Sequence, residues 1–304
     1  MSGFDADWLR QRASYDRAAR NPALAASFVS ALGHRTTAPL RLLDLAAGTG
    51  ANFRVLAPQI AQDQDWMLVD NDAALLARLP AEIARWAHDN GGDCAASPDG
   101  VLVRAASGAL WRVRMVRVDL AQSLETLDAT AFDGITTTAF LDLVSAAWLD
   151  RFVAWLTPGA RPLLATLTVD GRRLWQPALP DDTLIDQAFR RHQDGDKGFG
   201  PSLGPDATQA LAARLLSAGH QVHTARADWR ITNDDPEMLT RMIEESAAVA
   251  CEAMPDAATG VRHWRMRRLG QRGHGELAMT VGHEDLFARA TLRRARHTIT
   301  SESC

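Results

Sequence analysis

The chain has 304 residues, 46% of them hydrophobic, and a formal net charge of −4 at pH 7, so it is long and apolar enough for one large core with a cap. The slightly acidic balance excludes a general electrostatic attraction to polyanions, and we do not expect nucleic acid as a partner. No apolar run approaches the length of a membrane span, so we expect no membrane partner either.

The first forty residues (1–40) precede the earliest predicted strand and form a helical leader. Asp7 to Leu32 is rich in Ala and Arg and has the spacing of two short helices, broken near Asn21-Pro22. A leader in this position can cover a ligand, so Tyr15, the only tyrosine, is a candidate substrate-binding residue. A packed aromatic on a solvated helix is the competing interpretation.

The most informative segment is Leu42 to Gly50, Leu-Leu-Asp-Leu-Ala-Ala-Gly-Thr-Gly. An apolar strand, Arg41 to Leu45, stops on two glycines, and helical spacing resumes at Asn52 to Ala61. Glycines at a strand-to-helix turn allow the backbone to approach a ligand closely. Asp70 closes the next strand, Trp66 to Val69, where doubly wound folds place a carboxylate that binds ribose hydroxyls.

The residues around these glycines bear on which ligand the turn binds. A dinucleotide fingerprint needs a third small residue at position 53, where the chain has Phe53, and no Gly-Lys-Ser/Thr follows to indicate a P-loop. Asp44 lies beside the turn, where a carboxylate repels a diphosphate but can hold a cationic amino-acid group, directly or through water. The pattern therefore favours a ligand with a cationic part over a dinucleotide.

The next predicted elements are a crossover helix and a hairpin. Asp72 to His88 carries an apolar stripe at helical spacing. Asn90 to Gly100 is rich in turn residues. Val101 to Arg104 and Leu110 to Val118 then alternate in hydrophobicity around a short turn, which predicts a hairpin whose second arm runs into Asp119.

Two further strands complete the predicted parallel set. Phe132 to Ile135 opens one strand, and Thr138 to Asp142 follows it, at the edge of the sheet where a ligand would lie. Trp148 to Leu156 has the apolar face of a helix, and Arg161 to Val169 is the next apolar strand. Strands and helices alternate as in a doubly wound α/β fold.

A specialised connection, Arg190 to Pro205, is rich in Gly and Pro and also carries His192, Asp196 and Lys197. Such a connection can be held in one conformation at the carboxyl end of the sheet, where open α/β folds bind substrate. His192 is a candidate general base, Asp196 a group that orients it, and Lys197 a ligand for a substrate carboxylate. An ordered surface loop with solvated charges is the alternative interpretation.

The last quarter of the chain combines two helices and a strand. Pro236 to Met254 is a strongly apolar-faced helix, and a second helix lies around Ala257 to Leu269. The strand Glu276 to Val281 follows, and we expect it to pair antiparallel with His220 to Trp229. The two helices lie between these two strands in the chain, and His263 lies on the second helix.

The remaining charged and metal-binding residue types do not indicate further partners. Arg262 to Arg272 concentrates positive charge, but arginines on most faces of a helix are usually solvated or paired, and no aromatic platform accompanies them. His220 and His223 lie on alternate residues of a predicted strand without an acid cluster, so we predict no metal site. Three cysteines have neither metal nor disulfide spacing and fit a reducing, cytoplasmic compartment: Cys94, Cys251 and Cys304.

In its glycine turn and the landmarks that follow, the chain resembles the class I, Rossmann-like methyltransferases that use S-adenosylmethionine. The resemblance covers about residues 41–167 well and the remainder only as a topology. It implies an α/β fold with a doubly wound, mostly parallel seven-stranded sheet, an antiparallel last strand, helical cap insertions and an extra β-hairpin. The implied organisation is a leader and a single Rossmann-like domain (41–304) with a hairpin insertion (about 100–118), a substrate loop (about 170–205) and a helical cap (about 233–275).

The resemblance also implies roles for particular residues. Asp70 would bind the ribose, Asp119 would accept from the adenine amino group, and Phe140 would lie near the methyl group. Asp142 joins His192 as a candidate catalytic residue. The predicted substrate-binding residues are Tyr15, Lys197 and His263, and the predicted cofactor-binding residues are Asp44, Ala46, Gly48, Gly50, Asp70, Asn71, Asp119, Leu120 and Phe140.

The implied activity is methyl transfer from S-adenosylmethionine to an O, N or S nucleophile of a small molecule by in-line displacement. The protein would act as a monomer or homodimer. One alternative is an NAD(P)-dependent oxidoreductase on the same sheet, which Phe53 and Asp44 disfavour. Another is a noncatalytic protein that binds S-adenosylmethionine and transfers no methyl group.

Overall fold

The computed structural model describes residues 6–33, 38–193 and 195–291. Within these residues ten strands form one sheet in the order β3-β4-β5-β2-β1-β6-β7-β10-β8, and β9 pairs with β10. The strands are β1 (Leu40–Leu45), β2 (Gln64–Asp70), β3 (Asp93–Ser97), β4 (Gly100–Arg104), β5 (Leu110–Arg117), β6 (Gly134–Thr138), β7 (Leu163–Gln176), β8 (His220–Arg226), β9 (Trp229–Ile231) and β10 (Ala278–Ala290).

The direction of the strands confirms the predicted fold class. The neighbours from β5 through β2, β1 and β6 to β7 are all parallel, and β10 runs antiparallel to β7, β8 and β9. The seven strands from β5 to β8 are therefore the predicted mostly parallel sheet with an antiparallel last strand. The predicted hairpin is formed by β4 and β5, which pair antiparallel, and β3 extends this edge of the sheet by one further antiparallel strand.

Ten α-helices connect these strands in the described part of the chain. Local signals begin several of them: Asp72 accepts hydrogen bonds from the backbone N–H groups of the first turn of α4, and Asn21 does so at α2, just before a proline. The helices are α1 (Ala6–Ala19), α2 (Pro22–Ala31), α3 (Ala51–Leu56), α4 (Ala73–Asp89), α5 (Leu120–Ser123), α6 (Ala146–Leu156), α7 (Asp182–Gln193), α8 (Ala207–Ser217), α9 (Pro236–Ala253) and α10 (Ala258–Gly273).

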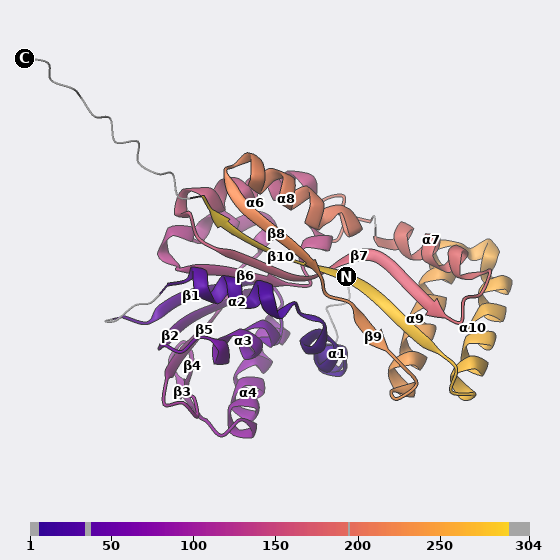
Figure 1. Ribbon diagram of the computed structural model, residues 1–304, viewed down its shortest axis with the longest axis horizontal. Coiled ribbons are helices and arrows are strands. Elements are labelled where there is room, and N and C mark those ends of the chain that lie inside the picture. The colour runs from indigo at the N-terminus through magenta and orange to yellow at the C-terminus, as the bar shows by residue number, and fades with distance from the viewer. Residues whose placement is uncertain (1–5, 34–37, 194, 292–304) are drawn as a thin grey trace, which may run out of the picture.

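Three apolar cores hold the layers together. Helices α6 and α8 cover one face of the sheet, and α2, α3 and α4 cover the other (Figure 1). At one end β7 and β10 continue past the parallel strands and carry α7, α9 and α10 (Figure 1), which pack around Trp175 and Trp264 in the third core. We call these three helices the cap.

Three sequence expectations about local structure are wrong. Residues 93–97, in a stretch expected to be a turn, form β3 because they pair with β4 along its whole length. Strand β7 continues to Gln176 and α7 follows it, where a substrate loop was expected to begin near residue 170. Strand β10 does not stop at Val281 but runs on to Ala290, through two register shifts against β7. For β7 and β10 the pairing with a distant strand overrides a local polar signal.

Candidate functional site

The turn after β1 is held in a backbone conformation that small residues favour. Ala46, Gly48 and Gly50 have φ angles of +54°, +55° and +75°, in the left-handed region. A Cβ atom at Gly50 would lie 2.7 Å from Cδ2 of Leu79 on α4, whereas one at Gly48 would be 3.7 Å from Leu9 of α1. Gly50 therefore allows α3 to start close to α4, and Gly48 lies beneath α1.

Asp70 holds this turn from the end of the neighbouring strand. Its Oδ2 accepts a hydrogen bond from the backbone N–H of Gly48 at 2.8 Å, and its Oδ1 accepts from that of Asp72 at 2.9 Å. Asp119 lies at the end of the next strand, β5, and caps α5 by accepting from Ala121 N at 3.0 Å. Because β2 and β5 pair in parallel, the two carboxylates project from neighbouring carboxyl ends of the sheet.

Asp44 is fully buried in β1, and only one of its two carboxylate oxygens is hydrogen-bonded. Its Oδ1 accepts from Asn52 Nδ2 and from Thr136 Oγ1, both at 2.8 Å. Its Oδ2 is buried and has no hydrogen-bond partner among the described residues. Burial raises the pKa of Asp44 to about 6, against the hydrogen bonds from Asn52 and Thr136 and the charge of Arg20, which lower it.

Arg20, which sequence reasoning missed, connects the leader to this site. It follows α1 and is only 9% exposed. One guanidinium nitrogen donates to Asn52 Oδ1 at 2.6 Å and to Thr166 Oγ1 at 2.8 Å, and the other donates to Thr138 Oγ1 at 3.1 Å. Since Asn52 in turn donates to Asp44, a buried cation and a buried carboxylate are joined through one amide.

A polar stripe on α1 leads to Arg20 and was available in the sequence as residues spaced four apart. Arg12 Nε donates to Asp16 Oδ2 at 2.9 Å, and the guanidinium lies 5.1 Å from the ring centroid of Trp229. Asp16 Oδ1 accepts from the Trp229 indole at 3.1 Å. Spacing of four places these side chains on one helical face, and that face lies toward the sheet.

Asp142, predicted as catalytic, lies just after β6. The positive charge of Arg12 on α1 acts on its carboxyl group. Burial raises the pKa of this carboxyl to about 6, while a backbone hydrogen bond and the charge of Arg12 lower it. The group therefore retains a proton to a higher pH than an ordinary aspartate, and it remains mostly ionised at pH 7.

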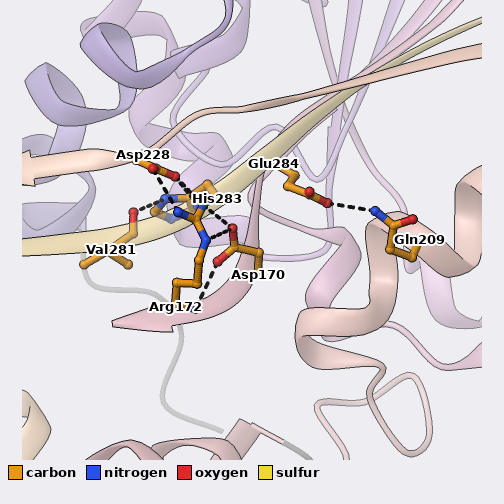
Figure 2. A network of polar contacts seen from close by, with 7 residues as sticks. All are labelled: Asp170, Arg172, Gln209, Asp228, Val281, His283 and Glu284. Carbon is orange, nitrogen blue, oxygen red and sulfur yellow. Dashed lines mark hydrogen bonds and ion pairs between the residues drawn. The ribbon is translucent and has the colours of Figure 1, made fainter. Parts of the chain in front are cut away.

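His283 on β10 is a second residue that sequence reasoning missed. Its Nδ1 lies 3.1 Å from the carbonyl oxygen of Val281 (Figure 2). A carbonyl can only accept, so Nδ1 carries the proton and Nε2 carries the lone pair. Burial and then Arg12 lower the pKa of His283 to about 4, against Asp16. The imidazole is therefore neutral at physiological pH.

An ion-pair network fixes the strands around His283 (Figure 2). Arg172 donates through Nη2 and Nη1 to the two oxygens of Asp228, at 2.6 and 3.1 Å, and through Nε to Asp170 Oδ2 at 2.7 Å. A Cβ atom at Gly282 would lie 2.1 Å from Asp170 Oδ1. The glycine before the histidine thus allows this network to pack against β10.

The other predicted cofactor residues lie along the same edge. Phe140 is buried after β6. Its ring centroid lies 5.4 Å from the ring centroid of Trp148 and 5.3 Å from that of Phe199. The Leu120 carbonyl accepts from the Trp148 indole at 2.7 Å. Asn71 is exposed directly after β2, and its carbonyl accepts from Arg117 at 3.0 Å.

The predicted substrate residues are more scattered. The Tyr15 hydroxyl donates to Asp235 Oδ2 at 2.8 Å, and burial together with that carboxylate raises its pKa. His263 is exposed on α10, and Lys197 is half-buried in the segment after α7. The side chain of His192 lies outside the described residues, so its role stays a prediction. Of the predicted cofactor residues, Gly48 and Asp70 are joined by a hydrogen bond, and Asp44 lies on β1, directly before the same turn.

Phe53 shows what occupies the third position of the glycine pattern. It is fully buried, with its ring 5.4 Å from Trp66, 5.8 Å from Trp86 and 6.1 Å from Trp111, edge to face in each case. The side chain fills the space in which a dinucleotide fold packs its helix closely against the strand. The third position of the pattern is therefore part of the aromatic core.

Two further findings concern metals and membranes. Among the described residues no group of three or more His, Cys, Asp and Glu side chains is placed to hold a metal ion. Within residues 6–33, 38–193 and 195–291, no helix has the length and hydrophobicity needed to cross a bilayer.

The mostly parallel sheet and the antiparallel β10 are those implied by the resemblance to class I S-adenosylmethionine-dependent methyltransferases. No family model matches the chain, and no curated protein is significantly similar to it.

Solved structures similar to this one have low sequence identity. A methyltransferase from Thiobacillus denitrificans in complex with S-adenosylhomocysteine has 15% identity and a TM-score of 0.43, covering 95% of this chain and 99% of that one. One from Geobacter sulfurreducens, in complex with the same ligand, has 14% identity and a TM-score of 0.41, covering 90% and 92%. A cyclopropane synthase from Mycobacterium tuberculosis has 12% identity and a TM-score of 0.42, covering 88% and 83%.

Proposed function

We propose that this protein transfers a methyl group from S-adenosylmethionine to an O, N or S nucleophile of a small molecule. The observation that carries the proposal is the buried, unpartnered Oδ2 of Asp44 beside the glycine turn. Buried polar atoms are nearly always hydrogen-bonded, and a buried carboxylate without a partner is costly. A ligand that brings an ammonium group to this turn supplies the missing donor, directly or through water.

The residues of the sheet edge fit the other parts of such a cofactor. Each oxygen of Asp70 accepts one backbone N–H, and a carboxylate has about four acceptor positions, so Asp70 retains capacity for two ribose hydroxyls. Asp119 and Leu120 at the end of β5 would border the adenine, and Phe140 the sulfonium side. When bound, S-adenosylmethionine supplies an electrophilic methyl group on a positively charged sulfur.

The protein itself contributes alignment and, where the acceptor arrives protonated, a base. A nucleophile held about 3 Å from the methyl carbon reacts without covalent help from the protein. His283 is neutral with its lone pair on Nε2, and Asp142 is mostly ionised at pH 7, so each is chemically able to take a proton. We propose these two residues as base candidates beside His192, with Lys197 as a candidate ligand for an acidic substrate group.

Calorimetric titration with S-adenosylhomocysteine tests the cofactor assignment. We expect low-micromolar binding to the wild type (about −8 kcal/mol) and loss of binding in Asp70→Ala. Asp65→Ala is the matched control. It also removes a carboxylate from β2, but the Asp65 carboxylate pairs with Arg114 and not with the glycine turn. Binding of NAD without binding of S-adenosylhomocysteine would contradict the proposal.

Transfer of the labelled methyl group from S-adenosylmethionine to a pool of small-molecule acceptors tests the chemistry. We expect label in a small product that depends on active protein. Asp142→Asn and His283→Gln separate the base candidates, because loss of turnover with retained cofactor affinity identifies the residue that acts on the acceptor. Cofactor binding without transfer to any acceptor would instead support a noncatalytic binding protein.

A further inference from the structure

A cavity lies where the leader meets α3 and α4, and the buried Arg20 is among its lining residues. Its volume is about 370 Å³, within the range of small-molecule sites. Residues of α2, α3 and α4 line it, and these helices cover one face of the sheet (Figure 1). Its floor includes Leu164 and Thr166 of β7, and Val55, Leu56 and Trp86 give it an apolar wall.

The cavity has an excess of positive charge. Three arginines line it, Arg17, Arg20 and Arg54, against one acid, Asp285. Both oxygens of Asp285 already accept backbone hydrogen bonds, from Asn21 N at 2.7 Å and Leu167 N at 2.8 Å. The lining acid is therefore hydrogen-bonded to the backbone, and the lining residues carry three guanidinium groups and one carboxylate.

Arg20 is buried and Arg54 is half-buried, and the charges of Asp16, Asp285 and Asp44 offset only part of the burial of Arg20, whose pKa is lowered. Arg20 is 9% exposed, and its Nε has no hydrogen-bond partner in the described part of the chain. Burial lowers the pKa of Arg54, and Arg17 and Arg85 lower it further, against Glu82. Glu82 is itself paired with Arg85 at 2.7 Å. A buried cation of this kind is stabilised by an anion in the same cavity.

We propose that this cavity binds a small organic oxyanion, a carboxylate or phosphate group carried on an apolar body. Guanidinium groups bind both kinds of oxyanion through paired N–H donors. The anionic group would lie among the three arginines, and the apolar body would lie against Val55 and Trp86.

The same arginines connect the cavity to the glycine-turn site. Arg20 donates to Asn52, which donates to Asp44, and Arg54 donates to the Thr49 carbonyl inside the turn at 2.6 Å. An anion that reorients either guanidinium changes the hydrogen bonds of the turn. The oxyanion therefore acts as a regulator of cofactor affinity. This regulatory part rests on the proposed function, whereas the binding itself does not.

Calorimetric titration with phenyl phosphate and with benzoate, against neutral benzyl alcohol, tests the binding. We expect one or both anions to bind the wild type and benzyl alcohol not to bind. Arg17→Gln and Arg54→Gln should each weaken binding about tenfold, the typical effect of losing a charged hydrogen bond. Arg78→Gln is the matched control. It removes the same positive charge, but Arg78 is exposed on α4 and does not line the cavity.

The outcomes separate the possibilities. Binding that is absent, or that weakens equally in all three variants, overturns the proposal. If Arg54→Gln does not fold, Arg17→Gln still decides, because Arg17 is exposed and its loss leaves no buried group unpaired.

The regulatory part is tested by repeating the S-adenosylhomocysteine titration with the cavity saturated by the tighter-binding anion. A change of threefold or more in Kd is expected, and an unchanged Kd overturns the coupling. If S-adenosylhomocysteine does not bind at all, the proposed function fails while the phenyl phosphate and benzoate titrations still decide the anion site.

Discussion

Replacing Asp44 by Asn should stabilise the fold while it removes cofactor binding. The carboxyl has a pKa of about 6 in the folded protein against 3.8 ordinarily, so ionising it costs the folded state about 3 kcal/mol at pH 7.5. Asn keeps an oxygen for the donors Asn52 and Thr136 but carries no charge. The gain is reduced by the new amide N–H, which replaces the unpartnered Oδ2 and has no acceptor there.

The pH dependence isolates the charge from that amide. An acid whose folded pKa is raised destabilises the protein progressively as the pH rises from 3.8 to 6, and by a constant amount above that. At pH 5 the cost of Asp44 is about 1.6 kcal/mol, so the benefit of Asp44→Asn should be about 1.4 kcal/mol smaller than at pH 7.5. The cost of the unpaired amide is the same at both pH values and cancels from this difference.

Urea unfolding of both proteins at pH 5 and pH 7.5 measures this difference directly, because the other titrating groups contribute equally to the two proteins. Titration of both proteins with S-adenosylhomocysteine at pH 7.5 measures the predicted loss of cofactor binding. If Asp44→Asn raises the free energy of unfolding by the same amount at both pH values, or by more at pH 5, the argument that ionised Asp44 destabilises the fold is refuted. Stabilisation with full cofactor binding would refute the role of its charge.

Three further predictions address the turn, the cap and β10. Gly50→Ala should lower the Tm more than Gly108→Ala, because both residues have positive φ but only a methyl group at Gly50 meets a neighbouring side chain; equal losses would show that backbone strain alone matters. Arg268→Met should cost about 3 kcal/mol or more in urea unfolding, since it removes a fully buried guanidinium and leaves Asp182 without its cationic partner, and Arg265→Met, which breaks an exposed pair on the same helix, less than about 1 kcal/mol; similar costs would contradict the burial argument. The His283 imidazole should titrate near pH 4 by NMR and stay neutral at pH 7, and a midpoint near 6.5 would show that it is solvated.

The parallel strands and the glycine turn could be predicted because their signals are local. Apolar runs that end at Leu45 and Asp70, with glycines at the turn after the first, define two strands, a turn and a carboxyl edge within thirty residues. The structure adds the hydrogen bond between Gly48 and Asp70, which joins two strands already known to be neighbours in such folds.

Arg20 and His283 could not be predicted because their environments come from distant segments. Arg20 has its partners more than thirty residues away in sequence, on three different elements. His283 lies in a polar interruption of β10, which by itself predicts the end of a strand, and only pairing with β7 and β8 keeps the chain extended there. The α1 residues spaced four apart were a usable signal, since polar groups on an inward helical face need partners.

The long strands β7 and β10 determine how the molecule unfolds. Along their length they are hydrogen-bonded to each other, from Ala288 beside the parallel strands to Ala278 beneath the cap. The cap is therefore built on the same β7–β10 ladder as the rest of the sheet, and no cut between the cap and the sheet leaves this ladder intact. We expect the whole chain to melt in one cooperative transition, and the cap to be impossible to excise as an independently folding unit.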